Sequence, residues 1–324
     1  MNVFIQGMRR SGTTILFDIF WEDPAVDCYY EPLAAGKKQV LGGGSGMRAS
    51  VDYFENIRHY RHRFMQQYSD PDLTTMEDFN YGAPGRPELE FEPDLPDYCK
   101  AYLRYLLEQS DHTVIKFTRM YCKVRVLREI DPDAKLIHIV RDPRAVVASY
   151  LFGKHQVRAH LFPNKKAFFT RKSEMIAWSS YAFSEYLLQT QEYAFLQGCE
   201  DFLRRLLLWK YTFRTTYETG KKDFGKNYLL LRHEDLQADP VQTVQQLYAF
   251  LERAVPPEVL DWAAKHVRPP QPPFAAQHPR WGEAFRTLEM AEDLNAAGYL
   301  ECLALSRRKE TFWQRTLRTL REGF

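Results

Sequence analysis

The chain has 324 residues, of which 45% are hydrophobic, and its 44 basic and 42 acidic side chains leave a formal net charge of +2. A charge this close to balance argues against nucleic acid as a partner, and the absence of any run of about 18 apolar residues argues against a membrane-spanning helix. The five cysteines form no Cys-x-x-Cys pair, so they indicate neither a disulfide framework nor a zinc site. We therefore expect a single cytoplasmic domain over residues 1–324.

The first predicted strand, residues 2–6, runs into a turn bounded by Gly7 and Gly12 and then into an amphipathic helix. This is the sequence form of a phosphate-binding loop, in which backbone N–H groups and the helix N-terminus hold an anion. The NTP-binding pattern places a lysine where Thr13 stands, and here the cation is Arg10 instead. The loop therefore predicts phosphate binding without the charge that reaches the outer phosphates of a nucleoside triphosphate.

Two long loop insertions are predicted, at about 34–112 and 153–175. Residues 70–97 in the first hold nine acidic side chains against Arg86 alone, with several prolines, which is typical of an extended, solvated loop and not of a core element. Residues 151–173 carry six lysines and arginines and no acidic residue. They form either a solvated cationic loop or a rim that attracts an anionic substrate.

A second motif follows the apolar segment 135–140, which has the character of a central parallel strand. Asp142 is expected to cap the next helix and Pro143 to begin it. Ser149 lies seven residues after Asp142, on the same helix face, and so points back toward Arg141 at the strand end. A guanidinium and a hydroxyl facing one crevice would suit a second phosphate.

Strand and helix patterns alternate along the chain. Strands are predicted over 2–6, 113–117, 135–140 and 227–231, and helices over 13–21, 121–130, 143–152, 174–196, 200–218 and 241–252. This alternation predicts an α/β fold with a parallel central sheet flanked by helices and with long loop insertions. The likeness of the first loop to the NTP-binding pattern adds the expectation of a topology like that of P-loop NTPases. Ligands then bind at the carboxyl ends of the strands, where both motifs open.

The segments Arg10–Thr14 and Arg141–Ser149 together resemble the two signature motifs of sulfotransferases that use 3′-phosphoadenosine 5′-phosphosulfate, PAPS. Further matches to the carbohydrate and bacterial branch of that family follow in the same order, at Tyr30–Leu33, Val114–Lys116, Leu231–Leu236 and Gly298–Leu300. The resemblance implies that the first motif cradles the 5′-phosphosulfate and the second grips the 3′-phosphate. The donor would be held by Arg9, Arg10, Ser11, Gly12, Thr13, Thr14, Arg141, Ser149, Arg232, Arg280 and Trp281.

The resemblance also implies catalytic roles. Glu31 matches the Glu-Pro of carbohydrate sulfotransferases and would be the base that takes the acceptor proton. Arg10 would face the negative charge that grows on the bridging phosphate oxygen, and Lys116 would lie beside the transferred group. His59 and His62 are alternative bases.

The function expected from these motifs is transfer of a sulfuryl group from PAPS to a hydroxyl acceptor, possibly a glycan, with adenosine 3′,5′-bisphosphate as product and no metal required. A P-loop kinase or NTPase is an alternative, for which Asp142 is the candidate Mg²⁺ ligand. A non-catalytic relative that binds nucleotide or glycan is the third. The acceptor and the oligomeric state do not follow from the sequence.

Overall fold

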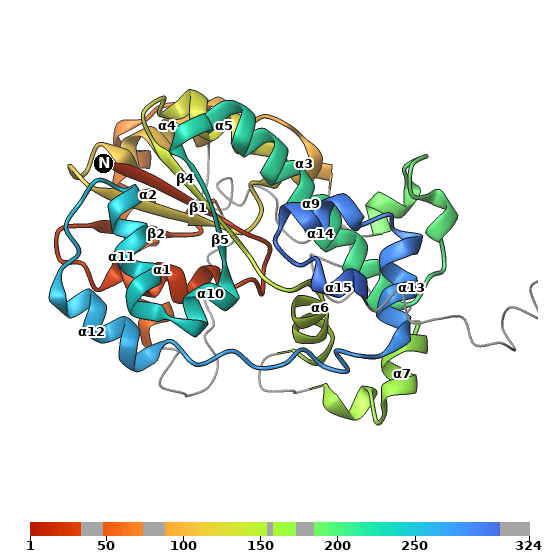
Figure 1. Ribbon diagram of the computed structural model, residues 1–324. Helices are drawn as coiled ribbons and strands as arrows, with labels where there is room; N and C mark the ends of the chain where they lie inside the picture. The colour runs from red at the N-terminus through yellow and green to blue at the C-terminus, as the bar shows by residue number, and fades with distance from the viewer. Residues whose placement is uncertain (34–47, 74–87, 154–157, 173–184, 305–324) are drawn as a thin grey trace, which may run out of the picture.

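The computed structural model describes residues 1–33, 48–73, 88–153, 158–172 and 185–304. Within these residues five parallel strands form one sheet in the order β2-β3-β1-β4-β5 (Figure 1). The strands are β1 (Asn2–Gln6), β2 (Asp27–Tyr30), β3 (Thr113–Phe117), β4 (Lys135–Val140) and β5 (Tyr228–Arg232). Strands β1, β3 and β4 are almost wholly buried, as their continuous apolar runs require.

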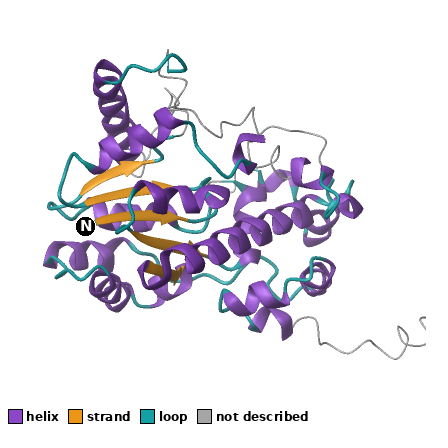
Figure 2. Ribbon diagram, turned by 90° about the horizontal axis from the view of Figure 1, so that it is seen from above, coloured by secondary structure: helices purple, strands orange, loops and turns teal. Residues whose placement is uncertain are grey.

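Helices lie on both faces of the sheet, and a further group lies beyond the carboxyl ends of its strands (Figures 1 and 2). The helices are α1 (Thr13–Trp21), α2 (Arg48–Gln67), α3 (Glu88–Phe91), α4 (Asp97–Leu107), α5 (Val124–Ile130), α6 (Pro143–Phe152), α7 (Lys165–Thr170), α9 (Asp201–Phe224), α10 (His233–Ala238), α11 (Pro240–Phe250), α12 (Pro257–His266), α13 (Pro279–Thr287), α14 (Ala291–Ala296) and α15 (Glu301–Ala304).

Three apolar clusters hold these layers together. One packs α1, α11 and α12 against the sheet, and a second packs α4 and α5 against the opposite face. The third fills the space among α6, α7, α9 and α13, beyond the strand ends. The predicted α/β fold with a parallel, helix-covered sheet is confirmed, and its layers fix the carboxyl ends of all five strands at one edge.

The structure departs from the predicted elements at several points. The edge strand β2 was not predicted, because Asp27–Tyr30 is short and carries no long apolar run. The helix expected over 174–196 is described only over 185–189, after which the chain turns; residues 173–184 lie outside the described part. Helix α9 continues to Phe224, past the predicted end at 218.

The acidic stretch 70–97 is not simply a solvated loop. Its described part includes α3, whose Leu89 and Glu90 are buried, while residues 74–87 are not described. Helix α4, also inside the predicted insertion at 34–112, contributes Tyr102 and Leu103 to the core. The sequence did not predict these buried residues, because the acidic side chains around them dominate the average composition of the segment.

Candidate active site

Each strand delivers a polar segment to the same edge of the sheet. The phosphate loop, residues 7–14, follows β1, and Glu31 follows β2. Thr118, Arg141 and His233 follow β3, β4 and β5. Because the strands are parallel and adjacent, segments that are far apart in the sequence meet at one edge of the sheet (Figure 1).

The phosphate loop has the backbone of an anion site. Helix α1 begins at Thr13, and no side chain of the described residues caps its first turn. The preceding Gly12 has φ 93°, and a Cβ there would lie 1.8 Å from Cδ2 of His233. At Gly7, a Cβ would lie 2.5 Å from the carbonyl oxygen of Ile139. Glycine is therefore required at both ends of the loop, and the open helix N-terminus can accept a phosphate.

The second motif contacts the loop directly. Nε of Arg10 donates to Oγ of Ser149 over 2.7 Å, and a guanidinium nitrogen of Arg141 donates to the carbonyl oxygen of Arg10 over 3.4 Å. Burial lowers the pKa of Arg10, and the positive charges of Arg9 and Arg141 lower it further. These cations repel one another, and a bound polyanion would remove the free-energy cost of that repulsion.

A buried network fixes the backbone of Arg141. Its carbonyl oxygen accepts a 3.0 Å hydrogen bond from the indole of Trp209. The next residue, Asp142, caps α6 by accepting from the N–H of Arg144, and Pro143 is the first residue of that helix, as predicted. Nε of Arg141 is buried and has no hydrogen-bond partner among the described residues. A half-buried arginine whose Nε is an unused donor is suited to a phosphate.

Glu31 and Lys116 form a buried ion pair next to the loop. Nζ of Lys116 lies 2.7 Å from Oε1 of Glu31, and Thr118 donates to the same carboxylate from its hydroxyl over 2.7 Å and from its N–H over 3.2 Å. Burial raises the pKa of Glu31, but the charge of Lys116 and these hydrogen bonds outweigh it, so the pKa lies below its ordinary value. Glu31 also sets the pKa of Lys116 above its ordinary value against the effect of burial.

Tyr30 joins this pair to the phosphate loop. Its ring centroid lies 4.0 Å from Nζ of Lys116, a cation–π distance, and its hydroxyl lies 3.3 Å from Oγ1 of Thr14. Tyr53 also stacks on this ring, with centroids 5.5 Å apart. The two predicted halves of the site, the donor loop and the Glu31–Lys116 pair, are thus connected through one aromatic side chain.

The structure does not bring every predicted residue to this edge of the sheet. Trp281 has no exposed surface and packs against Phe169 and Phe202, so the predicted contact between its indole and the nucleotide is wrong. Arg280 is paired with Glu200 at 2.8 Å, and also with Glu283 on its own helix at 3.1 Å. Trp281 and Arg280 thus stabilise α13. They were assigned to the nucleotide because they follow an irregular, proline-rich stretch that the resemblance alone placed there.

Arg232 lies at the carboxyl end of β5, as the resemblance requires. Its guanidinium lies 4.6 Å from the ring centroid of Tyr299, and its Nε is buried without a partner in the described part of the chain. A Cβ on Gly298 would meet its Cδ at 3.1 Å, so the Gly-Tyr pair near the C-terminus shapes the position of this arginine. Arg232 remains a candidate residue for binding the donor.

The alternative bases lie on α2. His59 and His62 are both exposed. His59 contacts the ring of Tyr60, and His62 lies 3.1 Å from the amide of Gln66, one turn along the helix. Their contacts are thus with α2 itself, as expected for the solvated face of a helix.

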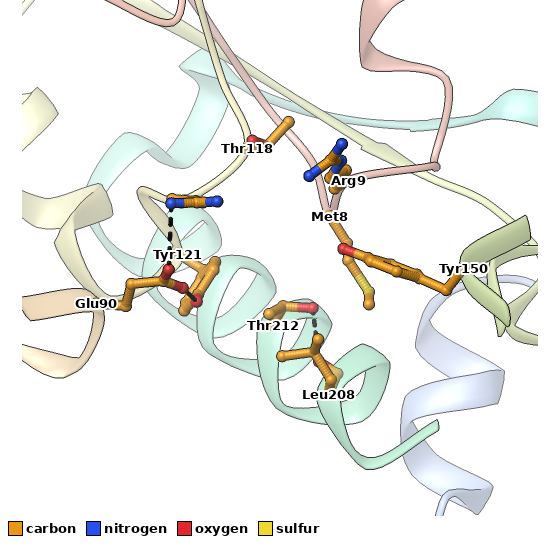
Figure 3. A pocket seen from close by; sticks show the side chains of 9 residues that line it. Met8, Arg9, Glu90, Thr118, Tyr121, Tyr150, Leu208 and Thr212 are labelled. Carbon is orange, nitrogen blue, oxygen red and sulfur yellow. Dashed lines mark hydrogen bonds and ion pairs between the residues drawn. The ribbon is translucent and has the colours of Figure 1, made fainter. Parts of the chain in front are cut away.

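A pocket beside the loop contains residues that the sequence did not single out (Figure 3). Thr118 and Tyr150 could have been found, since each stands next to a predicted residue, at the end of β3 and after Ser149. Glu90 could not, because it is one of nine acidic residues in the stretch 70–97. Only the fold shows that its carboxylate is buried at the site.

In the described residues no group of three or more His, Cys, Asp or Glu side chains is arranged to hold a metal ion. Asp142, the candidate Mg²⁺ ligand of a kinase, is instead paired with Arg144 at 2.6 Å. The same part of the chain has no helix that is both long and apolar enough to span a membrane.

Comparison with known proteins agrees with this geometry. The chain is 26% identical to human carbohydrate sulfotransferase 2 over 303 residues, which cover 81% of this chain and 54% of that protein. It is 28% identical to carbohydrate sulfotransferase 3 of Tetronarce californica over 162 residues, which cover 48% of this chain and 30% of that protein. It thus spans about half the length of the first of these relatives. The fold is similar to that of sulfotransferase STF9 from Mycobacterium avium, with a TM-score of 0.51 and 16% identity over 91% of this chain and 76% of that one. A sulfotransferase domain model matches residues 1–269, both signature motifs included, and the chain therefore belongs to the sulfotransferase family.

Proposed function

We propose that this protein transfers a sulfuryl group from PAPS to a hydroxyl group of an acceptor. The observation that carries the proposal is the position of the Glu31–Lys116 ion pair, which is joined through Tyr30 to a phosphate loop whose cation is Arg10. A carboxylate and two cations are thereby held around the point where an anionic donor and a hydroxyl would meet.

The donor fits the residues at the edge of the sheet. The open N-terminus of α1 and Arg10 suit its 5′-phosphosulfate, and Arg141 with its unused Nε suits the 3′-phosphate. Ser149 accepts a hydrogen bond from Arg10 and so holds the guanidinium of this loop residue against α6. When bound, the donor supplies the sulfuryl group on an anhydride oxygen that becomes a phosphate oxygen as the S–O bond breaks.

Glu31 and Lys116 would act on the acceptor side. Glu31 is ionised at neutral pH because its pKa is lowered, so it can accept the proton of the acceptor hydroxyl. The same ion pair makes it a weak base, however, while Lys116 stays bonded to it. A shift of Lys116 toward the negative charge of the donor would raise the pKa of Glu31 and strengthen it as a base.

The phosphoryl-transfer alternative has less support. Thr13 stands where a nucleoside triphosphatase has its lysine, and Asp142 is engaged as a helix cap and in the ion pair with Arg144. A non-catalytic role would leave the buried charges of Glu31 and Lys116 without a purpose, although burying them is costly. As to the acceptor, the two relatives are named as carbohydrate sulfotransferases, and we propose a glycan or another alcohol.

Thermal shift separates the donor classes. Adenosine 3′,5′-bisphosphate at about 100 times its Kd should stabilise the fold by about 2.7 kcal/mol, whereas ATP with Mg²⁺ should give no comparable shift. A [³⁵S]PAPS transfer screen over glycans, lipids, phenols and alkyl alcohols then tests turnover, which should persist in excess EDTA. Stabilisation by ATP–Mg²⁺ alone, with activity lost on chelation, would favour a kinase.

A further inference from the structure

A small pocket, partly open to solvent, lies beside the phosphate loop. Its walls include Arg9 from the loop, Tyr150 from α6 and Thr212 from α9 (Figure 3). Thr118, whose hydroxyl donates to Glu31, also lines it. The pocket therefore adjoins the donor loop through Arg9, and through Thr118 it adjoins a residue that is bonded to the proposed base.

Glu90 from α3 lines the same pocket with a buried carboxylate. Its side chain is 4% exposed; one oxygen accepts a short hydrogen bond from the phenol of Tyr121, and the other lies 3.5 Å from a guanidinium nitrogen of Arg119. Burial raises the pKa of Glu90, the charge of Arg119 and the bond from Tyr121 offset this in part, and the negative charge of Glu31 adds to the rise. The two carboxylates are near enough to repel, yet their surroundings move their pKa values in opposite directions.

Contacts other than those of this carboxylate also hold α3 in place. Nζ of Lys123 donates to the carbonyl oxygens of Leu89 and Glu90 over 2.5 and 3.3 Å, and both of these acceptors are backbone atoms. Phe91 packs against Tyr186 and Tyr211, with centroids 4.5 and 5.6 Å apart. Because these contacts also anchor α3, the carboxylate of Glu90 in the pocket wall is available for a further role besides its bonds to Tyr121 and Arg119.

We propose that Glu90 is a specificity-determining residue of the acceptor site, where its carboxylate accepts a hydrogen bond from a second hydroxyl of a polyhydroxylated acceptor while the reacting hydroxyl faces Glu31. The inference rests on the proposed function. A carboxylate offers about four acceptor directions, and Tyr121 and Arg119 are the partners that the structure describes for it. A site built around such a group discriminates strongly against an acceptor that lacks the matching hydroxyl.

The test compares Glu90→Gln and Glu90→Met with Glu92→Gln, an exposed carboxylate on the same segment. Titration calorimetry with adenosine 3′,5′-bisphosphate reports the donor side. Rates with [³⁵S]PAPS are measured with chitotriose and methyl β-glucoside as polyhydroxylated acceptors and 4-nitrophenol as a single-hydroxyl acceptor. We expect KM for the sugars to rise roughly 5- to 30-fold in Glu90→Gln and more in Glu90→Met, because a charge-assisted hydrogen bond is weakened or lost. The rate with 4-nitrophenol, the affinity for the bisphosphate and all values for Glu92→Gln should be unchanged.

Each of the other possible results would contradict one part of the proposal. If the wild-type protein does not bind the bisphosphate, the proposed function fails. If it binds the bisphosphate and transfers to 4-nitrophenol but to neither sugar, or if the sugars have the same KM in all variants, the role of Glu90 is overturned. A fall in kcat with every acceptor at constant KM would also overturn it, since Glu90 would then take part in the chemistry.

Discussion

Glu31 and Lys116 are 85 positions apart in the chain, yet their charged atoms lie 2.7 Å apart because β2 and β3 are adjacent parallel strands. Tyr30 pairs with Lys116 in the register of these strands, and the N–H of Glu31 donates to the carbonyl oxygen of Lys116. Glu31 itself has φ 49°, an uncommon backbone for a residue other than glycine. The sheet therefore holds the proposed base in a fixed and strained position, which favours a functional role.

The first prediction is that Glu31→Gln lowers kcat by roughly 10²- to 10⁴-fold, the loss expected when a positioned base is removed. The affinity for adenosine 3′,5′-bisphosphate should stay within a few-fold of wild type, because glutamine keeps the size of the side chain. Single-turnover rates and calorimetry measure the two quantities, with the exposed Glu22→Gln as control. The effect should be smaller for nitrophenols, which are already partly ionised. Wild-type turnover of the natural acceptor would mean that the base is another residue.

The second prediction concerns stability. Lys116→Met leaves the carboxylate of Glu31 buried without its counter-ion, and should lower the free energy of unfolding by about 3–5 kcal/mol. Adding Glu31→Gln removes the stranded charge and should recover much of that loss. Urea unfolding of the two single variants and the double variant measures the coupling. Additive losses would show that the pair does not interact as its geometry indicates.

The pH dependence of the same pair has a definite sign. The pKa of Glu31 in the folded protein lies below its ordinary value of 4.5, so the pair stabilises fully above pH 4.5 and loses this contribution as the pH falls through the folded pKa. The pKa of Lys116 in the folded protein lies above its ordinary value of 10.5. The stabilisation by the ion pair is therefore complete below pH 10.5, and it is lost only as the pH rises through the folded pKa of Lys116. In Glu31→Gln, the free energy of unfolding should therefore depend less on pH below pH 4.5 than it does in wild type.

The third prediction is that Arg141→Ala weakens binding of adenosine 3′,5′-bisphosphate by about 1.5–3 kcal/mol, roughly 10- to 150-fold in Kd. Ser149→Ala should act in the same direction, because Arg10 then loses the acceptor that orients it. Neither change should slow the bound complex as much as it weakens binding. Arg125→Ala, an exposed arginine paired with Glu129, is the control. Unchanged affinity in both variants would remove the second motif from the donor site.

Much of this site could be predicted because it depends on local patterns. The phosphate loop, the Asp142 cap and the Arg141–Ser149 spacing are all set within a few residues of a strand end. Once a parallel sheet is assumed, Glu31 and Lys116 are expected at the same edge. Their direct ion pair did not follow, because it depends on the register between β3 and the unpredicted edge strand β2.

The predictions failed where tertiary packing overrides composition. Trp281 was assigned to the nucleotide but lies in a core of aromatic side chains, and no pattern within its own segment shows which face is covered. Glu90 was grouped with solvated acidic residues, although Lys123 holds its backbone against the pocket. In both cases the partner is distant in the sequence, so the local average was misleading.

The fourth prediction is that Gly12→Ala destabilises the fold well beyond the cost of backbone strain. Its Cβ would lie 1.8 Å from Cδ2 of the buried His233 ring, in addition to the positive φ of 93°. Gly198→Ala is a matched control, with φ 72° and no atom within 4 Å of the new Cβ, and should cost about 1–2 kcal/mol. Thermal unfolding of both variants isolates the steric part, and equal losses would contradict the close packing of His233 on the loop.

The last prediction uses Asp18, a half-buried carboxyl on α1 that accepts a 2.8 Å hydrogen bond from the hydroxyl of Tyr53. Burial raises its pKa from 3.8 to about 6, and the bond from Tyr53 and the charge of Lys116 offset this only in part. Between these two values the folded protein holds more protons than the unfolded chain, so the free energy of unfolding falls as the pH rises through the interval.

Asp18→Asn cannot titrate, so its stability relative to wild type should increase from pH 4 to pH 7, by at most about 3 kcal/mol at 1.4 kcal/mol per pKa unit. Tyr53→Phe removes a hydrogen bond that lowers the pKa of Asp18, and the decline in that variant should extend to higher pH. Urea unfolding of the three proteins at half-unit steps of pH measures both effects. A constant difference between Asp18→Asn and wild type across the range would show that Asp18 ionises normally, and that the aromatic cluster around Tyr53 leaves it open to solvent.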